Sequence, residues 1–247
     1  MVAPRDDKDL IILEADGFID EVHGYGYPIK KALEKSDLSS TIVSLTDNAS
    51  NLSEFTGKPM IISGGMTEVT ANVSWIIEAK NQISDILQNN RDAKNESTTP
   101  LLGICFGAQL IAEAYSPGSV KYLDDPEIGV SRIRLEEKHP LFDGFPSEFD
   151  AYAFHYNQIK AKNLDVISSQ QHMGYSFVQA FEVSGSYAYG VQFHPELTLN
   201  AMKRLLRTYR SLISGLGHDV DQINTEILDI TENHRIFHNF YRIARQA

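Results

Sequence analysis

The sequence around the single cysteine constrains the fold more than any other segment. Cys105 lies between Gly103 and Gly107, directly after an apolar pair and directly before the apolar stretch 108–112. An apolar run followed by a turn and a helical pattern predicts a strand that passes sharply into a helix. Glycine two residues before and after the central side chain prevents a collision of Cβ atoms in such a turn. The segment therefore predicts a nucleophile elbow at Cys105, and the alternative is a buried structural cysteine.

Further apolar runs extend this pattern through the first half of the chain. Short apolar runs are typical of strands buried on both faces, and they occur at 10–13, 41–45 and 60–62. The segment 73–87 carries apolar residues at the 3.6-residue period of one helix face. Strands that alternate with helices imply a mostly parallel central sheet with helices on both faces.

The second half of the chain has a different pattern, with shorter alternating segments. These segments predict antiparallel strands at one edge of the sheet, at 130–135, 152–154, 166–168 and 177–183. The polar segment 92–99 predicts a surface loop. We expect one α/β domain over residues 1–247, with a helical segment at 221–246 that packs on the domain's own core. A docking surface for another protein is the alternative for that last segment.

Composition excludes several classes of partner. The chain has 33 acidic and 22 basic residues, a formal charge of −11, and no basic run that could neutralise phosphates or anionic lipid. We therefore expect neither nucleic acid nor a membrane as a partner. The first residues lack an apolar signal region, and one cysteine cannot form an internal disulfide, so we expect a cytoplasmic location.

A second motif contains a histidine and a carboxylate. The apolar segment 189–193 is followed by His194, Pro195 and Glu196. Proline ends the predicted strand, and histidine can act as both base and acid near neutral pH. A carboxylate two residues later can orient the imidazole ring. These residues are candidates to activate the thiol, although most histidines in proteins have structural or surface roles.

A third motif is the glycine pair Gly64-Gly65, which follows the run 60–62. A glycine pair at the end of a strand is most often a turn. It can also bring a backbone N–H close to an oxygen that becomes negative when a thiolate attacks a carbonyl carbon.

In this order, the three motifs resemble the class I glutamine amidotransferases, glutaminases with a Cys-His-Glu triad that include the amidotransferase part of GMP synthase. The resemblance covers most of the chain and implies a flavodoxin-like fold. It implies that Cys105 is the nucleophile, His194 the base and then the acid, and Glu196 the residue that holds the imidazole. The oxyanion donors would be the N–H groups of Gly65 and Phe106, and no metal or organic cofactor is expected.

The same resemblance implies that Gln109, His155 and Tyr156 contact the substrate. The chain departs from the family pattern at two places. Met66 follows the glycine pair where the family usually has proline, and Tyr156-Asn157 replaces the small or acidic residues common after the histidine.

Three functions remain open at this stage. The first is a glutaminase that releases ammonia from L-glutamine for a separate synthetase. The second is a hydrolase of γ-glutamyl peptides or conjugates, which a roomy pocket beside Tyr156 would favour. The third is a non-catalytic regulatory protein, which has no physical need for an intact triad. The sequence leaves the oligomeric state open, including a homodimer.

Overall fold

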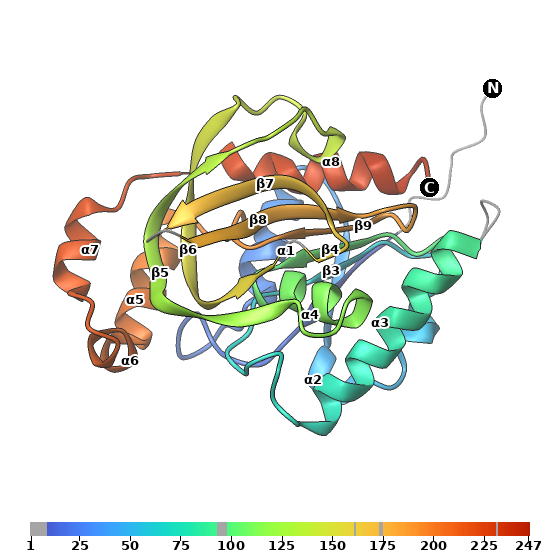
Figure 1. The fold of residues 1–247 in the computed structure, drawn as a ribbon, viewed down its shortest axis with the longest axis horizontal. Coiled ribbons are helices and arrows are strands. Elements are labelled where there is room, and N and C mark those ends of the chain that lie inside the picture. The colour runs from blue at the N-terminus through green and yellow to red at the C-terminus, as the bar shows by residue number, and fades with distance from the viewer. Residues whose placement is uncertain (1–8, 93–97, 161, 173–174, 231) are drawn as a thin grey trace.

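In the computed structural model, a mixed β-sheet lies at the centre of the protein with helices on both of its faces (Figure 1). The structure describes residues 9–92, 98–160, 162–172, 175–230 and 232–247. Within these residues, nine strands form the sheet in the order β2-β1-β3-β4-β9-β8-β6-β5, with β7 paired to β8. Most of the segment 92–99, where the sequence predicts a loop, lies outside the described residues.

The parallel part of the sheet consists of five neighbouring strands. β1 pairs in parallel with β2 and β3, β3 with β4, and β4 with β9. Their bounds are β1 Leu10–Glu14, β2 Ser40–Ser44, β3 Met60–Ile62, β4 Leu101–Ile104 and β9 Ala188–Val191. The predicted apolar runs form these strands with two exceptions. Leu45 opens a helix because the Ser44 side chain caps it by accepting from Asp47 N–H. The run 189–193 leaves the strand after Val191, before the proline that was expected to end it.

The predicted antiparallel edge is also present, and its strands are longer than the sequence pattern suggested. β8 pairs with β9 and β6 pairs with both β8 and β5, all antiparallel. The register of β5 on β6 shifts between Tyr122 and Glu127. The bounds are β5 Val120–Arg134, β6 Glu148–Ile159, β7 Asp165–His172 and β8 Tyr175–Val183.

Alternate side chains of β1 enter two separate hydrophobic cores, because successive residues of a strand point to opposite faces. Ile11 and Leu13 pack with residues of α3 and α4, whereas Leu10 and Ile12 pack with residues of α1 and α8. The sheet is therefore covered on both faces, as the alternation of strands and helices predicts. The bounds are α1 Gly26–Glu34, α3 Ser74–Asp92, α4 Phe106–Tyr115 and α8 Arg235–Ala244.

Helices α5 (Leu199–Thr208), α6 (Arg210–Gly215) and α7 (Val220–Glu226) lie together at one end of the molecule, on the left in Figure 1, next to β5 and β6. A third core joins this group to the rest of the protein through Tyr25, Tyr152 and Leu205. The segment 221–246 contains most of α7 and all of α8, whose residues Ile236 and Phe240 are fully buried. The remaining bounds are α2 Leu45–Asn48, η1 Leu52–Phe55, η2 Pro140–Phe142 and η3 Glu232–His234.

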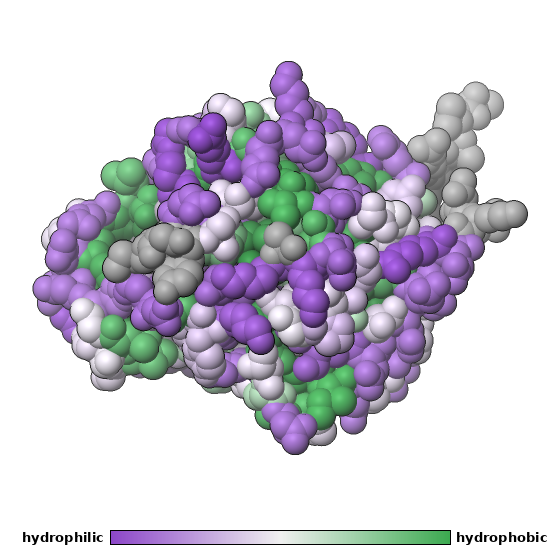
Figure 2. Space-filling view, in the orientation of Figure 1, coloured by the Kyte–Doolittle hydropathy of each residue, from purple (hydrophilic) through white to green (hydrophobic). Residues whose placement is uncertain are grey.

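The face in Figure 2 is mostly hydrophilic, with small hydrophobic areas near α6 and near the start of α3. Leu212 and Leu216 are exposed in and directly after α6, and Val73 and Ile77 are exposed around the start of α3. None of the described helices combines the length and apolar character needed to cross a bilayer. Among the described residues, no three His, Cys, Asp or Glu side chains are grouped closely enough to hold a metal ion.

Candidate active site

Cys105 lies at the sharp turn between β4 and α4 and has φ 50° and ψ −103°. A positive φ is uncommon for a residue with a side chain and costs of order 1–3 kcal/mol. The surrounding structure holds this conformation. The Cys105 N–H donates to the Val191 carbonyl at 2.8 Å, and the Gly107 N–H donates to the Ser63 carbonyl at 3.1 Å. The elbow is therefore anchored to β9 on one side and to the end of β3 on the other.

The two flanking glycines have no room for a side chain. A Cβ at Gly103 would lie 2.4 Å from the carbonyl carbon of Gly107. A Cβ at Gly107 would lie 2.3 Å from the carbonyl oxygen of Ile62. The steric reason for expecting glycine at both positions is therefore confirmed. The elbow differs from a simple surface turn in one respect, because Cys105 is only 5% exposed.

His194 and Glu196 form a buried pair at the end of the neighbouring strand. Ile104 pairs with Val191, so the residues that follow β4 and β9 meet at the same edge of the sheet. His194 Nδ1 lies 2.7 Å from Glu196 Oε1, and the two side chains are 1% and 0% exposed. The His194 N–H donates to the Tyr152 carbonyl at 2.8 Å, which fixes the backbone there.

The charge around His194 favours its protonated form. Burial alone would lower the pKa of His194, but the neighbouring Glu196 carboxylate and the thiolate form of Cys105 outweigh burial and raise that pKa well above its usual value. Cys105 and Glu196 therefore both act on the imidazole. An imidazolium next to the thiol at the N-terminus of α4 stabilises a thiolate.

The glycine pair lies between the histidine and the start of α4. A Cβ at Gly64 would lie 3.0 Å from His194 Cε1, and one at Gly65 would lie 3.2 Å from Phe106 Cγ. Phe106 is the first residue of α4, where backbone N–H groups have no partner within the helix. The structure thus brings Gly65 and Phe106, the two predicted oxyanion donors, to the same side of the elbow.

Asp16 fixes the loop that follows this pair, although no sequence motif indicated a role for it. Its carboxylate accepts from the N–H groups of Met66 and Thr67 at 3.2 Å and 3.1 Å. It also accepts from Thr67 Oγ1 at 2.6 Å. These bonds hold the loop at Met66, where the family usually has proline. A carboxylate can therefore hold in place a loop that lacks the proline usual in the family.

The three predicted substrate residues lie around one small cavity beside Cys105. The cavity has a volume of about 20 Å³ and is lined by Gly65, Met66, Thr67, Cys105, Phe106, Gln109, Phe154, His155, Tyr156 and Asn157. Gln109 Nε2 donates to Gln192 Oε1 at 3.1 Å. A much larger cavity, of about 790 Å³, lies elsewhere, between η2 and Arg242, and contains no triad residue.

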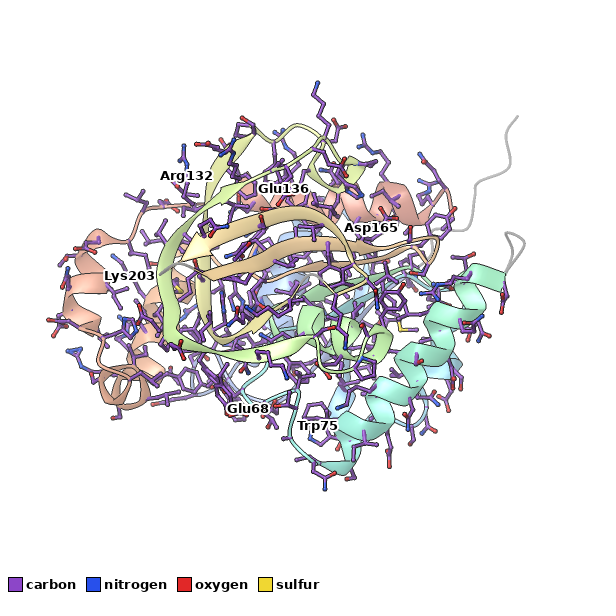
Figure 3. All side chains as sticks on the ribbon, viewed as in Figure 1. Glu68, Trp75, Arg132, Glu136, Asp165 and Lys203 are labelled. Atoms are coloured by element: carbon purple, nitrogen blue, oxygen red, sulfur yellow. The ribbon has the colours of Figure 1, made fainter. Side chains whose placement is uncertain are left out.

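Tyr156 forms part of the wall of the cavity beside the thiol. Its hydroxyl donates to the Met66 carbonyl at 2.9 Å, across from β6 to the loop after the glycine pair. A second link runs in parallel, since the Tyr122 hydroxyl donates to Glu68. Glu68 and Trp75 are labelled near one another at the bottom of Figure 3, and the Trp75 ring packs against Phe106. Burial, followed by the charges of Glu68 and Cys105, raises the pKa of Tyr156 to about 12, so the hydroxyl remains a donor.

His155 lines the cavity, but both of its ring nitrogens contact protein atoms. Nδ1 lies 2.9 Å from the Asn157 carbonyl oxygen, and Nε2 lies 2.8 Å from Glu127 Oε2. The sequence did not indicate Glu127, because it lies in a polar stretch without a motif. Tyr25 lies beside the catalytic histidine candidate; it is 1% exposed and its ring centroid is 6.1 Å from that of His194.

A thiol at a strand-to-helix elbow, next to a buried histidine–carboxylate pair, is the arrangement of enzymes that use a cysteine nucleophile. The chain belongs to the class-I glutamine amidotransferase family, whose model matches residues 18–209. The resemblance drawn from the three motifs is therefore confirmed.

Two curated relatives are subunits of different synthases. The chain is 31% identical over 180 residues to the first subunit of a glutamine-hydrolysing GMP synthase of Methanococcus maripaludis, covering 70% of this chain and 83% of the relative. It is 26% identical over 185 residues to the HisH subunit of imidazole glycerol phosphate synthase of Moorella thermoacetica, covering 66% and 87%.

Solved structures have the same fold. A glutamine amidotransferase from Thermotoga maritima superposes with a TM-score of 0.72 at 17% identity, covering 97% of this chain and 99% of the other. A putative GMP synthase subunit from Thermoplasma acidophilum gives a TM-score of 0.65 at 20% identity, covering 98% and 96%. The predicted α/β fold with its antiparallel edge is confirmed.

Proposed function

We propose that this chain hydrolyses the γ-carboxamide of L-glutamine through Cys105 and releases ammonia for a separate synthetase subunit. The observation that carries the proposal is the strained, nearly buried thiol at the N-terminus of α4, next to the His194–Glu196 pair, in a member of the glutamine amidotransferase family. A thiol held in a strained backbone conformation is typical of a functional site.

In the proposed reaction, the Cys105 thiolate attacks the γ-carboxamide carbon. The oxygen that becomes negative accepts hydrogen bonds from the N–H groups of Gly65 and Phe106. His194 donates its proton to the departing ammonia and leaves a γ-glutamyl thioester on Cys105. The same imidazole then takes a proton from water, which hydrolyses the thioester to glutamate. Glu196 holds the imidazole throughout and stabilises its protonated form.

The small size of the cavity beside Cys105 supports glutamine over larger γ-glutamyl compounds as the substrate. Its volume of about 20 Å³ is that of about one water molecule, so the surrounding residues must move apart before any substrate enters. The smallest leaving group, ammonia, requires the least movement. The roomy pocket that would favour a γ-glutamyl peptide hydrolase is absent from the surroundings of Tyr156 in the described residues.

The names of the relatives support a partner that uses the ammonia. Each of the two curated relatives is, by name, one part of a larger synthase. The higher identity to the GMP synthase relative, 31% against 26%, favours a partner of the GMP synthase type. A single cysteine, which excludes an internal disulfide, supports a cytoplasmic location.

Release of ammonia and glutamate by the purified chain tests this function, with Cys105→Ala as the blank. We expect the native chain to turn over L-glutamine and Cys105→Ala to show no turnover, while the variant melts at about the same temperature as the native chain. Faster turnover of γ-glutamyl peptides would instead establish the stand-alone hydrolase. Equal ammonia release by the native chain and Cys105→Ala, alone and with a synthetase of the GMP synthase type, would refute the proposed mechanism.

A further inference from the structure

Glu127 is a buried carboxylate that lies behind the glutamine pocket without lining it. It is 7% exposed and pairs across the sheet with His155, at the point where the register of β5 on β6 shifts. Its oxygens accept from His155 Nε2 at 2.8 Å, from Gln179 Nε2 at 2.9 Å and from Gln170 Nε2 at 2.6 Å. Four side chains from four strands, β5, β6, β7 and β8, therefore meet at this carboxylate.

The contacts of His155 determine its protonation. Nδ1 faces the backbone carbonyl of Asn157, and a carbonyl oxygen can only accept, so Nδ1 carries a hydrogen. Nε2 faces the carboxylate of Glu127, which is also an acceptor when ionised, so Nε2 carries a hydrogen as well. Both nitrogens donate, and the ring is an imidazolium.

The ionised state of Glu127 agrees with this assignment. Burial alone would raise its pKa, but the hydrogen bond and charge of His155, with smaller contributions from Ser131 and Gln179, lower it to about 2. The carboxylate is therefore charged at any pH at which the protein works. The buried pair as a whole is neutral, which is how a protein interior accommodates two charges.

Another histidine–carboxylate pair, which joins the residue before η2 to β8, has a different outcome. His139 Nε2 lies 2.9 Å from Glu182 Oε2, but His139 Nδ1 accepts from the Leu141 N–H at 3.1 Å. That ring must keep a lone pair on Nδ1, so it is neutral. The group that faces Nδ1, a carbonyl for His155 and an N–H for His139, thus decides the charge of each ring. The His139–Glu182 pair therefore provides a matched control.

Of the two residues in the first pair, His155 lies nearer the pocket. His155 lines the cavity beside Cys105, whereas Glu127 does not. None of the other nine lining residues has a basic side chain. His155 is therefore the one lining residue whose positive charge can attract the carboxylate of a substrate.

We propose that Glu127 is a positioning residue for substrate selection, which holds His155 as a cation so that the pocket favours the α-carboxylate of glutamine. The inference rests on the proposed glutaminase function and adds a residue to it. Glu127 acts through His155 and does not touch the substrate.

Glu127→Gln tests this role, because the new amide has the size of the carboxylate and can donate to an unprotonated Nε2. The ring then loses its charge but keeps its bond to Asn157. The assay compares L-glutamine with L-glutaminamide, in which a neutral amide replaces the α-carboxylate. We expect KM for glutamine to rise about tenfold and kcat to change by less than about twofold, as for loss of a buried ion pair whose positive member lies nearer the substrate. We expect KM for glutaminamide to stay unchanged.

The control Glu182→Gln makes the same exchange at the other pair and should leave both KM values as they are. Calorimetric binding of the two ligands to Cys105→Ala, and to the double variant that adds Glu127→Gln, gives the same comparison without turnover. The ring ¹⁵N resonances of His155 should indicate two protonated nitrogens in the native chain and one in Glu127→Gln.

An equal loss for glutamine and glutaminamide, or no loss for either, would overturn the role of Glu127 while leaving the glutaminase function intact. A His155 ring with one unprotonated nitrogen in the native chain would also overturn it. Failure of the proposed function has a different signature, namely ammonia release that does not depend on Cys105.

Discussion

Replacing Gly107 by alanine tests whether the elbow accepts any side chain where α4 meets β3. The added Cβ would lie 2.3 Å from the Ile62 carbonyl oxygen and 2.8 Å from its carbonyl carbon. A normal contact needs about 1 Å more, so α4 and β3 must separate. Ile62 cannot move freely, because β3 is paired with β1 on one side and β4 on the other.

The expected cost follows from this overlap. Forcing extra atoms into a packed interior costs about 1–3 kcal/mol, and the backbone position of the clash puts Gly107→Ala near the top of that range. For a chain of this length, about 3 kcal/mol lowers the melting temperature by about 6–12 °C. The Gly107 N–H also loses its bond to the Ser63 carbonyl, next to the glycine pair, so glutamine turnover should fall at least about a hundredfold.

Urea denaturation, thermal melting and ammonia release together measure these effects. Gly215→Ala is the matched control, because a Cβ there meets nothing within 4 Å and the residue ends helix α6. Its stability should change by less than about 1 kcal/mol. If Gly107→Ala has the same melting temperature as Gly215→Ala and the native chain, the steric reasoning for the elbow is wrong.

Three further outcomes are expected. In Glu196→Gln, loss of the carboxylate lowers the pKa of His194. The imidazolium is then lost at lower pH, so the alkaline limit of activity should move to lower pH and kcat should fall about a hundredfold. An unchanged pH–rate profile would contradict this. Tyr156→Phe removes the bond to the Met66 carbonyl and should raise turnover of γ-glutamyl peptides relative to glutamine, whereas an unchanged ratio would argue against closure by Tyr156. Because the pKa of Glu127 is lowered to about 2 from 4.5, its stabilisation is complete above about pH 4.5 and is lost as pH falls toward 2; urea midpoints of Glu127→Gln should therefore depend less on pH in this range than those of the native chain.

Local features of the sequence were enough to predict the elbow and the parallel core. The apolar runs become strands because burial on both faces of a sheet requires continuous apolar residues. The glycines beside Cys105 were informative because the clash they avoid is with residues adjacent in sequence or in the next strand. His194 and Glu196 are two residues apart, so their contact could be expected from spacing alone.

Other parts of the site have no local signature. Asp16 holds a loop 50 residues further along the chain, and Glu127 pairs with a histidine 28 residues away. The closed pocket depends on Tyr156 meeting Met66 across 90 residues of sequence. Residues at such separations come together only when the sheet assembles, and their spacing follows no helical or strand period.

The sequence by itself determined the class of fold, the family and the thiol with its histidine and glutamate, because each depends on short-range pattern and sterics. Only the tertiary structure decided that the thiol is nearly buried, that the Tyr156 hydroxyl meets the Met66 carbonyl beside it and that His155 lies between Glu127 and the Asn157 carbonyl. Exposure and protonation depend on every group that packs around an atom, and those groups come from strands distant in sequence.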